Sequence, residues 1–73
     1  MIMSGKKDAT LRQVRLIDIH GTQFYDIEYT HDEAPELVRS ARIGVESAYD
    51  QPRLGDKVVV SYLMNVVTTV ERR

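Results

Sequence analysis

The chain contains no cysteine and no tryptophan, and its 73 residues include only one phenylalanine, two prolines and four glycines. Without cysteine, neither disulfide bonds nor thiolate metal clusters can supplement the core. A chain of this length buries only about 60% of the surface that its unfolded form exposes. The core is therefore expected to be small, to consist of Val, Ile, Leu and Tyr side chains, and to be stabilised by packing or by association.

Long apolar runs and glycine-rich motifs are also missing. The longest nearly apolar stretch, residues 58–70, is interrupted by Ser61, Asn65, Thr68 and Thr69 and is shorter than a membrane-spanning helix requires. The N-terminal residues lack the apolar segment of a secretory signal. The scattered glycines form no P-loop and no dinucleotide-binding fingerprint. These features predict a cytoplasmic protein that has no membrane segment and binds no cofactor.

Charge of one sign dominates the middle of the chain, although the formal net charge is only −1. The segment 26–36 contains no lysine or arginine. Its five acidic residues are Asp26, Glu28, Asp32, Glu33 and Glu36. The flanking segments are mildly basic, so the pattern predicts an acidic surface between two basic ones.

Residues 1–9 are polar and without pattern, which predicts a flexible N-terminal tail followed by a single domain over 10–73. In the segment 10–20 the apolar positions alternate and then change parity between Leu16 and Ile17, which indicates a bulge or a strong bend. Gly21 separates this run from the alternating segment 24–30. The two runs are therefore expected to form a hairpin, with the tyrosines of the second run in the core.

The segment 33–48 fits two periodicities. As a helix, it places its alanines, leucine and valines at spacings of three and four, with Asp32 as N-cap. As a strand, it places Ala41, Ile43 and Val45 on one face, and Gly44 avoids the cost of about 1 kcal/mol that glycine carries inside a helix. The strand is the preferred interpretation, and a helix at about 33–48, giving an α+β fold, is the alternative.

Two more strands are predicted near the C-terminus, at residues 57–64 and 66–70, with Asn65 in a tight turn between them. The first carries apolar residues on both faces, as a central strand covered on two sides does. Five short strands, one of them bent, favour closure, because a closed sheet has no exposed edges. The predicted fold is all-β, a small five-stranded OB-like or SH3-like barrel.

The segment from Leu54 to Leu63 contains the pattern Gly-Asp-x-Val-x-Val-x-Tyr, and the strand 66–70 follows it. This segment, about a quarter of the chain, resembles the closing hairpin of small bacterial β-barrel domains of unknown function. The resemblance implies an OB-like or SH3-like fold and a bacterial source. It carries over no functional residue, because the pattern describes only a turn and a buried strand.

The two histidines, His20 and His31, are the candidate imidazole bases and metal ligands of the chain. Neither histidine belongs to a recognisable nucleophile–base arrangement, and both are expected at strand ends or turns. The run from His31 to Glu33 contains competent zinc ligands, but consecutive residues rarely converge on one ion. Asp26 and Glu28 share a strand face, as an acid–base dyad would, although an exposed strand face explains them equally. We therefore predict neither an enzyme nor a metal site.

Two binding functions remain. The first is a non-enzymatic interaction module that binds a protein partner or forms a homodimer. Its candidate contact surface is Phe24, Asp26, Glu28, Asp32, Glu33 and Glu36. The alternative is an OB-like protein that binds single-stranded nucleic acid. Its candidate surface is Arg12, Arg15, Arg39, Arg42 and Arg53.

Overall fold

The computed structural model describes residues 4–73, which form one five-stranded antiparallel sheet. The all-β prediction is confirmed, because the described residues contain no α-helix and only one 3₁₀ turn. None of these residues lies in a helix long and apolar enough to cross a membrane. In chain order the elements are β1 (Ser4–Ile19), β2 (Thr22–His31), β3 (Val38–Gly44), η1 (Val45–Ser47), β4 (Lys57–Leu63) and β5 (Val66–Arg72).

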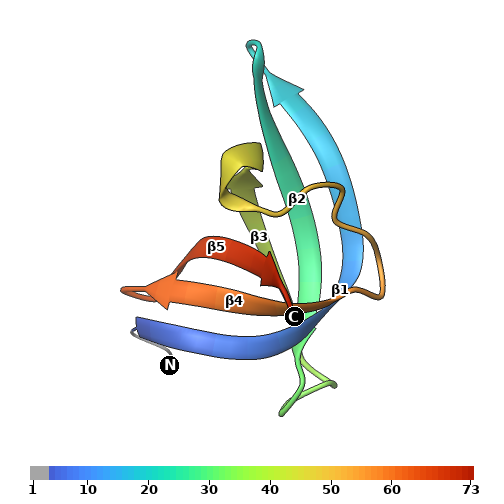
Figure 1. Cartoon of the computed structure of the whole chain (residues 1–73), viewed down its shortest axis with the longest axis vertical. Coiled ribbons are helices and arrows are strands. Elements are labelled where there is room, and N and C mark those ends of the chain that lie inside the picture. Colours follow the sequence, from blue (N-terminus) through green and yellow to red (C-terminus); the bar gives the residue numbers. More distant parts are fainter. Residues whose placement is uncertain (1–3) are drawn as a thin grey trace.

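The sheet is organised by the long strand β1, which joins two hairpins. The strand order is β3-β2-β1-β4-β5, so that the first half of β1 pairs with β4 and the second half pairs with β2. Figure 1 shows β1 running along the bottom of the molecule and then curving upward. The register between β1 and β2 shifts at Arg12, between Leu11 and Gln13. The predicted irregularity therefore exists, but it lies nearer the N-terminus than the change of parity at Leu16 suggests.

The two edge strands, β3 and β5, lie close to each other but form no ladder. Within residues 4–73, the one backbone bridge toward β5 from this side of the sheet is a parallel pair of Ala48, which follows η1, and Val70. The sheet is thus strongly curved but not closed into a barrel. This open seam leaves a cleft between β3 and the β4–β5 hairpin.

The core lies on the concave face of the sheet, where every strand contributes alternate side chains. Tyr29 and Ile27 are buried as predicted, and Tyr25 packs against them from a partly exposed position. On β4, the face of Val58, Val60 and Tyr62 is buried. Among the residues that the structure describes, the buried apolar side chains are Ala9, Leu11, Ile27, Tyr29, Ile43, Val58, Val60, Tyr62 and Val70.

The opposite face of β4 corrects one expectation. Val59 is only partly buried and Leu63 is exposed, so this strand is central in the sheet but covered on one side only. The sheet has a single apolar layer, because 70 residues provide no second element to cover its outer face.

The predicted N-terminal tail is wrong for residues 4–9, whereas residues 1–3 lie outside the described residues. Residues 4–9 belong to β1 and pair with β4, from Ser4 opposite Leu63 to Ala9 opposite Val58. Ala9 is fully buried. The sequence conceals this strand because its side chains are mainly polar, whereas its pairing is made by the backbone.

The helical alternative for 33–48 is also wrong. The segment contains β3, which pairs with β2 over its full length and places Ile43 in the core. The strand begins three residues before the expected Ala41 and ends at Gly44, where η1 begins. The alternation of Ala41 and Ile43 toward the core identified the strand correctly, since a helix would turn Ile43 away from its apolar stripe.

Both tight hairpins have the backbone that two-residue loops require. His20 and Gly21 connect β1 to β2 with positive φ angles of 53° and 84°. Met64 and Asn65 connect β4 to β5 with φ angles of 51° and 69°. Positive φ at both central positions is typical of type I′ turns, whose twist matches that of the flanking strands.

Candidate functional site

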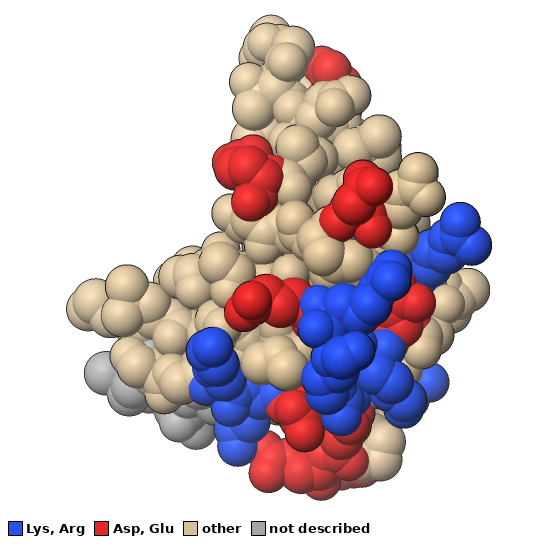
Figure 2. All heavy atoms as spheres, in the orientation of Figure 1, with Lys and Arg blue, Asp and Glu red and all other residues tan. Residues whose placement is uncertain are grey.

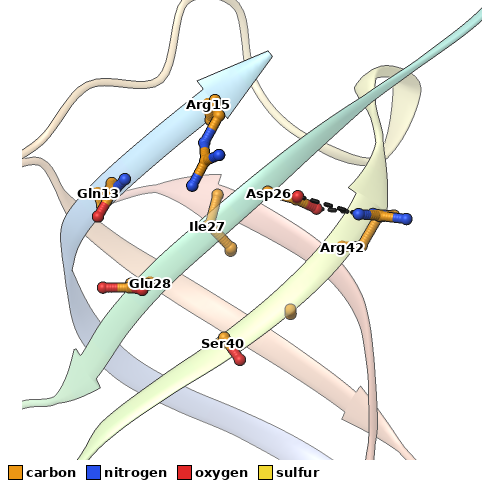
Figure 3. A pocket seen from close by; sticks show the side chains of 8 residues that line it. Gln13, Arg15, Asp26, Ile27, Glu28, Ser40 and Arg42 are labelled. Carbon is orange, nitrogen blue, oxygen red and sulfur yellow. Dashed lines mark hydrogen bonds and ion pairs between the residues drawn. The ribbon is translucent and has the colours of Figure 1, made fainter. Parts of the chain in front are cut away.

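The outer face of β1, β2 and β3 carries a shallow hollow of about 400 Å³. Two cross-strand rows of side chains border it, because residues that are paired across antiparallel strands point to the same face. One row is Arg15, Asp26 and Arg42, and the other is Gln13, Glu28 and Ser40. Figure 3 shows Arg15 reaching from β1 toward β2, and Asp26 directed at Arg42.

The hollow mixes residues from both predicted surfaces. The Arg42 guanidinium donates two hydrogen bonds to the Asp26 carboxylate, of 2.7 Å from Nε and 3.1 Å from the second nitrogen. This pairing holds the pKa of Asp26 below its usual range, and Arg15 adds to the effect. Asp26 is therefore bound to an arginine and is not free to form a dyad with Glu28. Phe24 lies on the same strand face and is half-buried.

The other acidic residues of the predicted contact surface lie apart from this hollow. Asp32 and Glu33 follow β2 and are paired within the molecule: Asp32 with Arg73 at 2.8 Å, and Glu33 with Lys7 at 2.6 Å. These contacts lower the pKa of both carboxyl groups. Glu36 is exposed in the β2–β3 connection. Figure 2 shows red and blue side chains intermixed over the lower part of the molecule.

The five predicted arginines are not brought together into one patch. Arg15 and Arg42 flank Asp26 on the outer face. Arg12 donates a hydrogen bond of 3.0 Å from Nε to Thr30 Oγ1. Arg53 lies in the loop before β4, where its backbone N–H binds the Asp56 carboxylate. Arg39 is directed to the opposite, concave face.

A buried polar cluster occupies one end of the concave face. The Tyr62 hydroxyl lies 2.7 Å from the Tyr29 hydroxyl and 2.7 Å from His31 Nε2, so it connects the two other side chains. All three residues are buried. Burial and the hydrogen bond with Tyr62 raise the pKa of Tyr29, and burial, assisted by Arg39, lowers the pKa of His31. Both shifts favour the uncharged forms of Tyr29 and His31.

The position of His31 in this cluster also separates it from the other candidate zinc ligands, Asp32 and Glu33. His31 points into the core toward Tyr62, whereas Asp32 and Glu33 are exposed and contact Arg73 and Lys7. The three side chains diverge, as neighbouring residues in and after a strand do.

Arg39 stands beside this cluster. It is the register partner of Tyr29 across β2 and β3, and both residues line the seam cleft of about 360 Å³ together with Tyr62. Its Nε atom is buried and has no hydrogen-bond partner among residues 4–73. The sequence contained a signal for this position, because Arg39 has the same parity as Ala41 and Ile43. Sequence reasoning grouped it with the exposed arginines because of its charge.

An apolar tip, defined here as Leu63, Met64 and Val66, projects at the β4–β5 turn. The three side chains are 58%, 71% and 62% exposed. In Figure 2 the left end of the molecule, where this turn lies, is tan on the visible face of the described residues. Turns of this type usually carry Asn, Asp or Gly at their two central positions, so Asn65 fits the turn, whereas the exposed Met64 is a residue that local structure does not require.

The buried histidine makes stability depend on pH. Since the folded-state pKa of His31 is lowered below its ordinary value of 6.5, the unfolded chain binds this proton more readily. The contribution of the neutral His31 to the free energy of unfolding should therefore be complete above about pH 6.5. The free energy of unfolding should fall as the pH decreases from there toward the lower folded-state pKa. Urea unfolding between about pH 7.5 and pH 5.5 measures this, in a range above the titration of the paired carboxyl groups.

The exposed His20 supplies the matched control. His31→Gln should abolish most of the pH dependence in this range, whereas His20→Gln should leave it unchanged. A pH dependence that survives in His31→Gln would show that another group titrates, and would contradict the burial of His31.

The three regions differ in what they can do chemically. The outer hollow presents alternating charges that neutralise each other. The seam cleft presents a guanidinium whose Nε has no hydrogen-bond partner within residues 4–73, beside tyrosine hydroxyls, and the apolar tip presents surface that water solvates poorly. Comparison of the chain with known protein families, curated proteins and solved structures finds no match.

Proposed function

We propose that the chain is a non-enzymatic interaction module that associates with a protein surface, a second copy of itself being the first partner to test. The apolar tip is the observation that carries this proposal. Exposed contiguous apolar surface is uncommon on small soluble proteins and marks interaction sites. Burying it would also add apolar contacts to a small core, which has nine buried side chains among residues 4–73.

The proposed fold behind this module is a partly open barrel of the OB-like type. The strand order β3-β2-β1-β4-β5, together with the parallel bridge between Ala48 and Val70 across the two edges, supports it. A cytoplasmic location, a bacterial source and kinship with small bacterial barrel domains stay predictions from the sequence.

The acidic contact surface predicted from the sequence is a less favourable primary site. Asp26, Asp32 and Glu33 are each paired with a basic side chain of the same molecule. A basic partner would have to displace these ion pairs, whereas a partner at the apolar tip displaces only water. We therefore place the primary contact at the tip, with Phe24, Glu28 and Glu36 as residues that a larger partner would reach.

Association through the tip predicts a specific response to one substitution. Met64→Lys should shift the protein from dimer toward monomer, because a charge would have to be desolvated at the centre of the contact. Size-exclusion chromatography with light scattering over a concentration series measures the change. A loss of about tenfold or more in dimer affinity is expected for a residue at such a centre.

Leu54→Lys is the matched control, because Leu54 is also 71% exposed but lies in the loop before β4. It should leave the association state unchanged. Equal effects of the two substitutions would contradict the tip as the contact site. A wild-type protein that is monomeric at every concentration would refute self-association. A different protein that binds the wild type but not Met64→Lys would then show that the tip contacts another protein instead of a second copy.

Single-stranded nucleic-acid binding is the second candidate. Arg15 and Arg42 border the hollow on the outer face of β1–β3, and OB-like barrels bind oligonucleotides on this part of the sheet. A fluorescence titration with labelled single-stranded DNA and RNA decides it. Binding that weakens steeply with salt, and that Arg15→Gln reduces more than Arg53→Gln, would favour this function over protein binding.

A further inference from the structure

The seam cleft between β3 and the β4–β5 hairpin is a second feature, whose polar side chains the proposed association does not use. Tyr29, Tyr62 and Arg39 line it from the core side, and residues 65–67 line it from the turn and β5. Its volume of about 360 Å³ lies within the range of small-molecule sites. The cleft exists because the two edge strands diverge here and do not complete a ladder.

Arg39 is the unusual residue of this cleft. It is half-buried, its Nε has no hydrogen-bond partner, and its guanidinium forms no ion pair within residues 4–73. A buried donor on a charged group is costly when it stays unpaired, and such groups in folded proteins call for a bound partner. A guanidinium presents its N–H groups as a planar fork that fits the two oxygens of a carboxylate, phosphate or sulfate group.

The nearby carboxylates do not supply that partner. Arg39 is close enough to help lower the pKa of Glu33, but the Glu33 carboxylate accepts its hydrogen bond from Lys7. Asp26 is bound to Arg42 on the outer face. The charge of Arg39 is therefore left for a group that enters from solvent.

The tyrosine pair adds a second donor. Tyr62 connects His31 Nε2 to the Tyr29 hydroxyl, each at 2.7 Å. When His31 carries its proton on Nε2, that proton is donated to Tyr62, Tyr62 donates to Tyr29, and the Tyr29 hydroxyl keeps a proton to donate to a ligand. Hydrogen bonds that follow one another in this way strengthen one another in a buried setting.

We propose that the seam cleft is a binding site for a small oxyanion group, held by the Arg39 guanidinium with the Tyr29 hydroxyl as the second donor. The two donors, Arg39 and Tyr29, lie outside the apolar tip, although Val66 belongs both to the tip and to the rim of the cleft. Its ligand is a carboxylate or a tetrahedral oxyanion of the phosphate and sulfate type. Separate titrations with sulfate and with acetate distinguish these two classes of ligand.

Occupation of the site should be coupled to His31. The charges that act on this histidine are Arg39 from β3, Lys7 from β1 and Glu33 from the β2–β3 connection, and its ring nitrogen is hydrogen-bonded with Tyr62 on β4. An anion on Arg39 offsets the positive charge that helps to lower the pKa of His31, so this pKa should rise when the site is filled. By reciprocity, the anion should bind more tightly as the pH falls through that range.

The test is a titration of the full chain with sodium sulfate and, separately, with sodium acetate, at constant ionic strength with chloride. Proton–nitrogen NMR follows Arg39 Nε–H, and the His31 ring signals give its pKa with and without the anion. We expect a saturable shift of the Arg39 signal and a higher His31 pKa with at least one of the two anions. The anion that saturates identifies the class of oxyanion.

Variants separate this site from general charge effects. Arg39→Gln should weaken binding by about tenfold to a hundredfold, the effect of losing charge-assisted hydrogen bonds, and Arg53→Gln should not change it. Arg39→Lys keeps the charge in place and should still lose about tenfold, because lysine lacks the fork. This second variant keeps the test decisive if Arg39→Gln fails to fold. Linear, unsaturable shifts, or equal losses in Arg39→Gln and Arg53→Gln, would overturn the proposal.

Discussion

Replacing Leu11 with alanine is expected to lower the free energy of unfolding by about 2–5 kcal/mol, the usual cost of truncating a fully buried leucine. Leu11 is 0% exposed and lies opposite Tyr29, beside the bulge where β1 changes direction. Its backbone also holds the loop before β4, through hydrogen bonds with Asp56 and Gly55. Because those bonds survive the substitution, the loss reports the cavity that the missing side chain leaves in the core.

Leu54→Ala is the control for this prediction, since it removes the same atoms from an exposed site and should change the free energy by less than about 0.5 kcal/mol. Urea unfolding of both variants gives the comparison. In a domain of this size, each kcal/mol lowers the melting temperature by about 4–8 °C. If the two leucines proved equivalent, the core would not lie on the concave face of the sheet.

Tyr62→Phe is expected to cost about 1–3 kcal/mol for each buried group that it leaves without a partner. The substitution removes one hydroxyl, but it leaves both the Tyr29 hydroxyl and His31 Nε2 without this hydrogen-bond partner. The ring remains, so the apolar packing against the core is preserved. The loss measured by urea unfolding therefore reports the hydrogen bonds alone.

Two further variants check this interpretation. Tyr25→Phe should be nearly neutral, because its hydroxyl forms no side-chain hydrogen bond among the described residues. The double variant Tyr29→Phe with Tyr62→Phe should cost less than the sum of the single losses, since removing both hydroxyls leaves one orphaned group fewer. Additive losses would show that the three side chains do not act as one cluster.

The sequence by itself predicted the strands whose alternation is strong. On β2, alternation placed Ile27 and Tyr29 in the core, because a strand that buries one face repeats every two residues. On β4 the sequence carries apolar residues on both faces, and only the structure shows that the face of Val58, Val60 and Tyr62 is the buried one. The same parity at Ala41 and Ile43 identified β3 against the helical alternative. The β-hairpin turns were located from Gly21 and Asn65, which tolerate positive φ.

The charged surfaces were harder to predict than the strands, because the sequence shows only which charged residues are neighbours along the chain. The acidic segment 26–36 divides in the structure, since Asp26 lies on a strand face beside Arg42, whereas Asp32 and Glu33 lie after the strand beside Arg73 and Lys7. These partners are between 16 and 41 residues away along the chain. No local pattern reveals pairings over such separations.

The amino-acid sequence determined the composition of the core, the absence of disulfides, the all-β class and the positions of the tight turns, because these depend on residue type and local alternation. Only the tertiary structure decided that polar residues 4–9 form a strand, that the sheet stays open between β3 and β5, and that Arg39 meets Tyr29 and Tyr62 at that seam. Those features depend on which strand edges meet after the chain has bent, and backbone pairing at long range leaves no signature in the neighbouring residues.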